Sequence, residues 1–212
     1  MRDDESWSAE TIEFVTSDGV QLVGDLIAPA DAGGGAAITR AVAVCHPHPQ
    51  YGGNRFNPVV ESCWRALADA GVPALRFDFR AEYGLGESER LDLVAALDVL
   101  AATFPDARLG VVGYSFGAMV ALGTRDERIA MKVLIAPPLS RMQVDPAVAC
   151  PTFVLTPAHD QFNPPEAARE ATDNWAMSNP SVSMEVVEMS DHFLHGRTQH
   201  VADRATAWLT AH

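Results

Sequence analysis

The chain has 212 residues, of which 48% are hydrophobic and 20% charged, and its 15 basic and 28 acidic side chains give a net charge of −13. This composition fits a folded globular protein and is too apolar for a disordered chain, and the excess of acid would repel nucleic acid and anionic membranes. The length suits one sizeable hydrophobic core, so we expect a single domain over residues 1–212.

Cysteine usage and the start of the chain bear on the compartment. The first ten residues, MRDDESWSAE, are acidic and lack the apolar segment of a secretory signal. Apolar runs stay well short of the ~20 residues that a membrane helix needs. Cys45, Cys63 and Cys150 have spacings that match neither a disulfide framework nor a CxxC pair. We therefore expect a cytoplasmic protein with reduced thiols and no membrane partner.

The first predicted elements are two strands in TIEFVTSDGVQLVGDLIAP, residues 11–29. Apolar and polar residues alternate on both sides of Ser17, Asp18 and Gly19, which is typical of a hairpin of half-buried strands with a tight turn. The following ADAGGGAA, residues 30–37, predicts a surface loop.

Beyond this loop the pattern changes to nearly continuous apolar runs, which suit strands covered on both faces. The runs are RAVAVCH (40–46), GVPALRFDF (71–79), RLGVVGY (108–114), MKVLIAP (131–137), CPTFVLTP (150–157) and VSMEVVEM (182–189). Stretches with helical spacing lie between most of them and after the last, at 59–70, 91–104, 164–177 and 196–211. The alternation predicts an α/β protein with a mainly parallel sheet and helices on both sides.

In such a sheet, ligands bind beyond the carboxyl ends of the strands. Ser115 lies there, in the G-x-S-x-G sequence GYSFG that joins the run LGVV to the short predicted helix FGAMVALG. A strained strand-turn-helix lets the hydroxyl project over the sheet edge, and the flanking glycines let the helix pack closely. We predict that Ser115 is a nucleophile; the alternative is an incidental serine in a glycine-rich turn.

A nucleophilic serine needs a base and an acid that orients the base. In this architecture they follow the serine in the order acid, then histidine. Asp160 comes directly after a predicted strand, in AHDQFNPPE, and is the predicted acid. Its alternative role is in capping or turn formation, and the rival acids are Asp126, Asp145 and Asp191.

The segment SDHFLHG after the final strand contains two histidines, His192 and His195. His192 is nearer the strand end, where its ring could reach both the serine and the acid, so we predict it as the base. For His195 we expect a structural role or a place in the pocket wall.

An oxyanion hole needs two preorganised N–H donors, one from the residue after the nucleophile and one from the loop after the third strand. Phe116 is the first predicted donor. The second lies in CHPHPQYGGN, where the two prolines have no N–H, which leaves His48 as the predicted donor and Tyr51 as a reserve.

The same segment has two other chemical interpretations. His46 and His48 could join a later histidine around zinc, but the flanking prolines and the lack of a nearby carboxylate or cysteine pair disfavour it, so we predict no metal. Cys45 could be a thiol nucleophile, although a cysteine inside an apolar strand is usually an inert core residue.

Taken together, the chain resembles the α/β-hydrolase superfamily, and within it the small, capless, dienelactone-hydrolase-like group. The resemblance rests on CHPHPQYGGN, LRFDFR, GYSFGA, LIAPP and DHFLHG, in that order. It implies the three-layer fold without a cap, and the roles given above to Ser115, Asp160, His192, Phe116 and His48. Dienelactone hydrolases carry a cysteine where this chain has Ser115, so their substrate is not carried over. The loop AEYGLGES also departs from the group.

The connection between LIAPP and CPTFVL is too short for a helical cap, so we expect a shallow, open pocket. The predicted substrate-binding residues are Tyr51, Tyr83 and Phe162, and Phe56, Phe116 and Met142 are further apolar candidates. These features predict a serine hydrolase that cleaves small carboxylic esters, thioesters or lactones without a cofactor. The alternative is a non-catalytic binding or scaffold protein on the same fold.

Overall fold

The structure, a computed structural model, describes residues 7–29 and 37–212. Within these residues, eight strands form one sheet. The strands are β1 (Trp7–Val15), β2 (Gln21–Pro29), β3 (Arg40–Cys45), β4 (Ala74–Phe77), β5 (Arg108–Tyr114), β6 (Ile129–Ile135), β7 (Thr152–His159) and β8 (Val182–Asp191). The helices are η1 (Pro49–Tyr51, a 3₁₀ turn), α1 (Pro58–Asp69), α2 (Glu89–Thr103), α3 (Phe116–Gly123), α4 (Pro165–Ala176) and α5 (Thr198–Ala211). The loop predicted at 30–37 lies outside the described residues except for its last position.

The strand order is β1-β2-β4-β3-β5-β6-β7-β8. Strand β2 runs antiparallel to both β1 and β4, and every other neighbouring pair is parallel. The predicted parallel sheet with an antiparallel opening hairpin is therefore confirmed. Because β3 to β8 share one direction, their carboxyl ends meet at one edge of the sheet.

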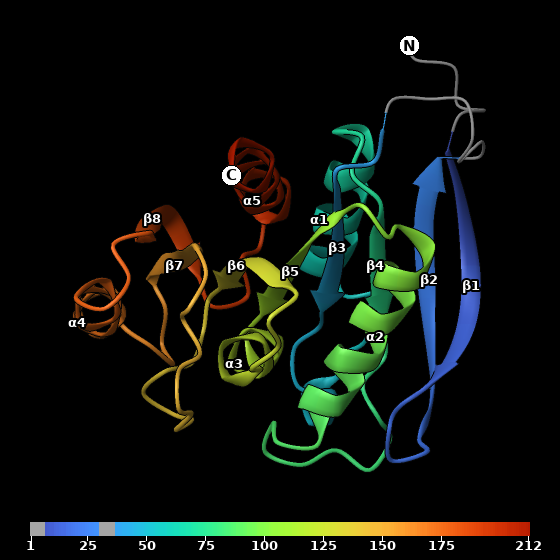
Figure 1. The fold of residues 1–212 in the computed structure, drawn as a ribbon. Coiled ribbons are helices and arrows are strands. Elements are labelled where there is room, and N and C mark those ends of the chain that lie inside the picture. The colour runs from blue at the N-terminus through green and yellow to red at the C-terminus, as the bar shows by residue number, and fades with distance from the viewer. Residues whose placement is uncertain (1–6, 30–36) are drawn as a thin grey trace.

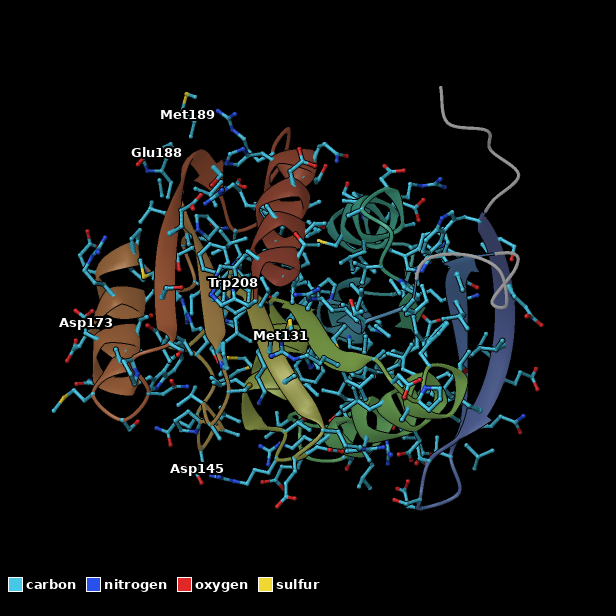
Figure 2. All side chains as sticks on the ribbon, turned by 45° about the horizontal axis from the view of Figure 1, so that its top comes forward. Met131, Asp145, Asp173, Glu188, Met189 and Trp208 are labelled. Atoms are coloured by element: carbon cyan, nitrogen blue, oxygen red, sulfur yellow. The ribbon has the colours of Figure 1, made fainter. Side chains whose placement is uncertain are left out.

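Helices cover both faces of the sheet. Helices α1 and α5 pack with one set of strand side chains, and α2 and α3 pack with the opposite set. Figure 1 shows α5 and α3 on opposite sides of β5 and β6. On the α5 side, Met131 of β6 and Trp208 of α5 lie between the helix and the sheet (Figure 2). Burial on both faces explains why these strands are apolar along their whole length.

The connection from β6 to β7, residues 136–151, contains no helix or strand. The absence of a cap at this position agrees with the prediction, and it leaves the carboxyl edge of the sheet covered by loops. No helix in the described part of the chain is long and apolar enough to cross a membrane.

Candidate active site

Ser115 occupies the sharp turn between β5 and α3. Its backbone has φ 53° and ψ −114°, in the region that side-chain-bearing residues rarely adopt and that is concentrated at functional sites. Its N–H donates to the carbonyl of Ile135 at 2.9 Å, which fixes the turn to the end of β6. The side chain is half-buried and faces the pocket described below.

The two glycines of GYSFG allow this turn by their lack of side chains. A Cβ on Gly113 would lie 2.4 Å from the carbonyl oxygen of Gly117, and a Cβ on Gly117 would lie 2.5 Å from that of Cys45. Both neighbours are backbone atoms that cannot move aside. The close packing of α3 against β3 and β5 therefore requires glycine at both positions, as the sequence predicts.

The three side chains predicted as nucleophile, base and acid form one hydrogen-bonded chain. Ser115 Oγ lies 2.9 Å from His192 Nε2, and His192 Nδ1 lies 2.9 Å from Asp160 Oδ2. One tautomer satisfies both contacts: Nδ1–H donates to the carboxylate, and Nε2 accepts from the hydroxyl. This arrangement can move the serine proton to the imidazole.

Asp160 is held rigidly at the end of β7. The side chain is 1% exposed, and its second oxygen, Oδ1, accepts hydrogen bonds from the N–H groups of Phe162 at 2.8 Å and Asn163 at 3.1 Å. Asp160 therefore does form a turn, which was the alternative role considered from the sequence, but the turn uses only Oδ1. The other oxygen stays directed at the histidine.

His192 is fixed by its backbone and its ring. The side chain of Gln161 accepts from its N–H at 3.4 Å, and its carbonyl accepts from the hydroxyl of Tyr114 at 2.9 Å. The edge of the Phe162 ring packs against the imidazole, with the centroids 4.6 Å apart. His195, in contrast, is exposed and has its ring beside Phe193.

The predicted oxyanion donors flank the serine. The N–H of Phe116 belongs to the first turn of α3, where N–H groups have no partner within the helix. His48 caps the start of η1, and its ring packs on Phe116 with the centroids 4.5 Å apart. Tyr51 is excluded as the reserve donor, because its N–H donates to the carbonyl of His48 at 3.0 Å.

His46 and Cys45 have structural surroundings. The His46 ring contacts the carbonyl of Pro47 through Nδ1 at 2.6 Å and accepts from the N–H of Phe79 through Nε2 at 3.0 Å, so both nitrogens are engaged. Burial lowers the pKa of His46. Burial also raises the pKa of the Cys45 thiol, which keeps it protonated and unreactive. No cluster of three or more potential metal ligands occurs among the described residues.

A pocket of about 600 Å³ opens over Ser115 and His192. Its walls come from the loops that follow β3, β4, β6, β7 and β8, together with the turn at the serine. Tyr51 and Leu85 stand at its rim and are 84% and 85% exposed. The pocket is therefore open to solvent and its walls are mostly apolar, which suits a small organic substrate.

The predicted pocket residues divide into two groups. Tyr51, Phe116, Met142 and Phe162 line the pocket. Tyr83 and Phe56 do not: Tyr83 packs edge-on against the ring of His48 at 5.2 Å, and Phe56 lies against the guanidinium of Arg55. Both residues belong to loops that contribute other side chains to the pocket, but their own side chains contact other neighbours.

Leu85, Arg141 and Phe193 also line the pocket and were not among the pocket residues named from the sequence. Leu85 lies in AEYGLGES, the loop that departs from the related group. The buried carboxylate of Glu89 holds this loop by accepting from the N–H groups of Gly84 and Gly86, the latter at 3.0 Å. Hydrophobic periodicity does not indicate that an acidic residue at the start of a helix, such as Glu89, is buried.

Comparisons with known proteins agree with this geometry. The model of the alpha/beta hydrolase family matches residues 44–212. An alpha-beta serine hydrolase homologue from Coxiella burnetii is 25% identical, with a TM-score of 0.74 over 92% of this chain and 96% of that one. A serine hydrolase without a lid from Xanthomonas campestris is 25% identical, with a TM-score of 0.75 over 93% and 95% of the two chains.

A dienelactone hydrolase from Anabaena variabilis shares the fold at 18% identity, with a TM-score of 0.77 over 98% of this chain and 99% of that one. The resemblance inferred from the motifs is therefore confirmed. Since the family model matches most of its length, the chain belongs to the alpha/beta hydrolase family.

Proposed function

We propose that the protein is a serine hydrolase that cleaves small carboxylic esters through an acyl-enzyme on Ser115. The observation that carries the proposal is the unbroken chain of two 2.9 Å contacts from Ser115 through His192 to Asp160, at the floor of an open pocket. Membership of a hydrolase family and the likeness to serine hydrolases support it. Thioesters and lactones present the same reacting carbonyl and fall within the proposed class.

In the first half of the reaction, His192 Nε2 takes the proton from Ser115 Oγ as the oxygen attacks the ester carbonyl. The N–H groups of Phe116 and His48 stabilise the resulting oxyanion. The tetrahedral intermediate collapses, the carbon–oxygen bond to the alcohol breaks, and His192 gives its proton to the leaving alkoxide. Asp160 keeps the imidazole in the required tautomer and stabilises its positive charge.

In the second half, a water molecule attacks the acyl-serine while His192 takes its proton, and collapse releases the acid and restores the serine hydroxyl. Every proton that moves is carried by the same imidazole, so this scheme requires no cofactor. We further propose that residues 1–212 work as one domain in the cytoplasm.

The decisive experiment is labelling with a fluorophosphonate probe, followed by intact-mass and peptide mass spectrometry. We expect a single adduct on Ser115 in the wild type and none in Ser115→Ala. The same two proteins are assayed with p-nitrophenyl acetate, for which we expect the variant to lose turnover by about 10⁴-fold or more.

The matched pair His192→Ala and His195→Ala tests the choice of base. Loss of labelling is expected only for His192→Ala, because the ring of His195 is exposed and pairs with Phe193. Equal labelling of the wild type and Ser115→Ala would overturn the mechanism. A folded wild-type protein that takes no label would instead favour a non-catalytic binding protein on this fold.

A further inference from the structure

Among the residues that the structure describes, Arg141 is the one residue of the pocket lining with a permanent charge. Within residues 7–29 and 37–212, this lining contains no aspartate, glutamate or lysine and no second arginine. The second lining residue able to carry charge outside the proposed triad is His48, and burial lowers the pKa of its ring and favours the neutral form. A single guanidinium therefore sets the charge of this cavity.

The guanidinium of Arg141 stands outside the ion pairs that the described residues form. Among the residues that the structure describes, no carboxylate lies within 4.0 Å of it. Arg125 and Arg204, two other exposed arginines, pair with Asp145 and Glu185. Since no ion pair with another described residue occupies them, the donors of the Arg141 guanidinium are available to a ligand.

The backbone beneath Arg141 is fixed relative to the proposed triad. The N–H groups of Arg141 and Met142 donate to the carbonyl of Pro138 at 2.9 and 3.1 Å, which closes a turn directly after β6. The neighbouring Ser140 donates to Asn163 Oδ1 from its N–H at 3.1 Å and from its hydroxyl at 2.7 Å.

Asn163 is the link from this turn to the acid. It is 1% exposed, and its own N–H donates to Asp160 Oδ1 at 3.1 Å. The turn that carries Arg141 is thus tied through one buried side chain to the residue that orients the base. A substrate that binds Arg141 would therefore have its ester carbonyl held at a fixed position relative to Ser115.

We propose that Arg141 binds a carboxylate of the substrate, so that the preferred substrates are esters that carry a negative charge on the acyl or the alcohol portion. The planar guanidinium offers parallel N–H donors that match a carboxylate in a bidentate geometry. The overall charge of −13 repels anions at long range, so this preference comes from the local contact. The inference rests on the proposed ester hydrolysis and deepens it.

Matched pairs of esters test the proposal on each side of the scissile bond. For the acyl side, mono-p-nitrophenyl esters of glutaric, adipic and suberic acid are compared with p-nitrophenyl esters of pentanoic, hexanoic and octanoic acid, so that several reaches are sampled. For the alcohol side, the acetyl ester of 4-hydroxybenzoate is compared with that of methyl 4-hydroxybenzoate. The readout is the ratio of kcat/KM for the charged over the neutral ester in each pair.

In Arg141→Gln we expect this ratio to fall by about tenfold for at least one pair, the size of one good contact between charged groups. Arg141→Lys keeps the charge without the bidentate geometry and should give an intermediate ratio. Arg169→Gln is the matched control, because this substitution removes the same charge outside the pocket. Arg169 is exposed on α4 and is not one of the lining residues. Its ratios should equal those of the wild type.

Ratios that are the same in the wild type and Arg141→Gln for all pairs would overturn this inference while leaving ester hydrolysis intact. The inference also fails if Arg169→Gln lowers the ratio as much as Arg141→Gln, since the effect would then be one of net charge. Absence of hydrolysis of every ester, charged or neutral, would refute the proposed function and this inference with it.

Discussion

The hydroxyl of Tyr114 donates a 2.9 Å hydrogen bond to the backbone carbonyl of His192. Tyr114 is the last residue of β5 and immediately precedes Ser115, whereas His192 follows β8, which is three strands away in the sheet. One hydrogen bond thus ties the loop of the proposed base to the strand that ends at the proposed nucleophile.

Tyr114→Phe removes this tie without changing the ring. The buried carbonyl of His192 loses its partner, which costs about 1–3 kcal/mol of stability. The imidazole is then less well positioned relative to the serine, so we expect kcat to fall by about ten- to a hundredfold. Steady-state kinetics should show the change in kcat, with KM much less affected. Thr124→Val is the control. It removes a buried hydroxyl that donates to the carbonyl of Val120 at 2.8 Å, and Thr124 does not line the pocket.

Asp160→Asn and Asp191→Asn separate the proposed acid from its nearest rival. Asp160→Asn should lower kcat by about 10⁴-fold, because the amide cannot hold the same histidine tautomer. The Asp191 carboxylate accepts from the N–H of Phe193 at 3.0 Å and makes no contact with the imidazole ring, so Asp191→Asn should change kcat by less than about tenfold. The comparison uses kcat on a single ester, and the reverse order of effects would move the acid to Asp191.

Gly117→Ala tests the packing of α3. The new Cβ would lie 2.5 Å from the carbonyl oxygen of Cys45 and 2.7 Å from that of His46, so the helix must shift, which we expect to cost about 2–4 kcal/mol. At Gly84 the nearest atoms to an added Cβ are the Glu89 carboxylate oxygens at 3.8 and 3.9 Å, and Gly84→Ala should cost less than about 1 kcal/mol. Urea unfolding of the two variants measures both values, and similar losses would contradict the steric argument.

Lys132 gives a pH-dependent contribution to stability. It is 2% exposed, its Nζ donates to the carbonyls of Thr124 and Ala147 at 2.9 and 2.8 Å, and burial lowers its pKa from 10.5 to about 8. Between pH 8 and 10.5 the unfolded chain therefore binds more protons than the folded one, so this group makes stability rise with pH by on the order of 3 kcal/mol.

Lys132→Met removes the titration, so the measurement is the free energy of unfolding of the wild type minus that of the variant. This difference should stay constant below about pH 8 and then shift in favour of the wild type as the pH rises. Subtracting the variant also cancels the opposing ionisation of buried groups such as Cys45, whose pKa burial raises. A difference that is flat from pH 7 to 10 would contradict the lowered pKa.

Most of the fold could be predicted because its strands are buried on both faces. The bounds of β5 agree residue for residue with the run 108–114. The edge strand β1 begins at Trp7, four residues before the predicted start, and these first residues are mostly exposed. The predicted run 71–79 shortens to β4 because Phe79 leaves the sheet and donates its N–H to His46.

The candidate site likewise has a part that could be predicted from the sequence and a part that could not. The positions of Ser115, Asp160 and His192 follow from one rule about strand ends, because each lies at the carboxyl end of a strand of the parallel part of the sheet. The supports around them, such as Tyr114 on the His192 carbonyl and Asn163 between Ser140 and Asp160, join loops that are far apart in the sequence. Such contacts depend on where each loop turns, which hydrophobic periodicity does not encode.

Because no helical cap interrupts residues 136–151 and several separate loops each lend one or a few side chains to the pocket, the walls can change independently. A substitution at Leu85 alters one wall, and one at Phe193 alters another, without touching the strands that hold the three residues of the proposed triad. The molecule thus separates the part that must stay fixed for chemistry from the parts that select among substrates. Selection for a new substrate could proceed one loop at a time.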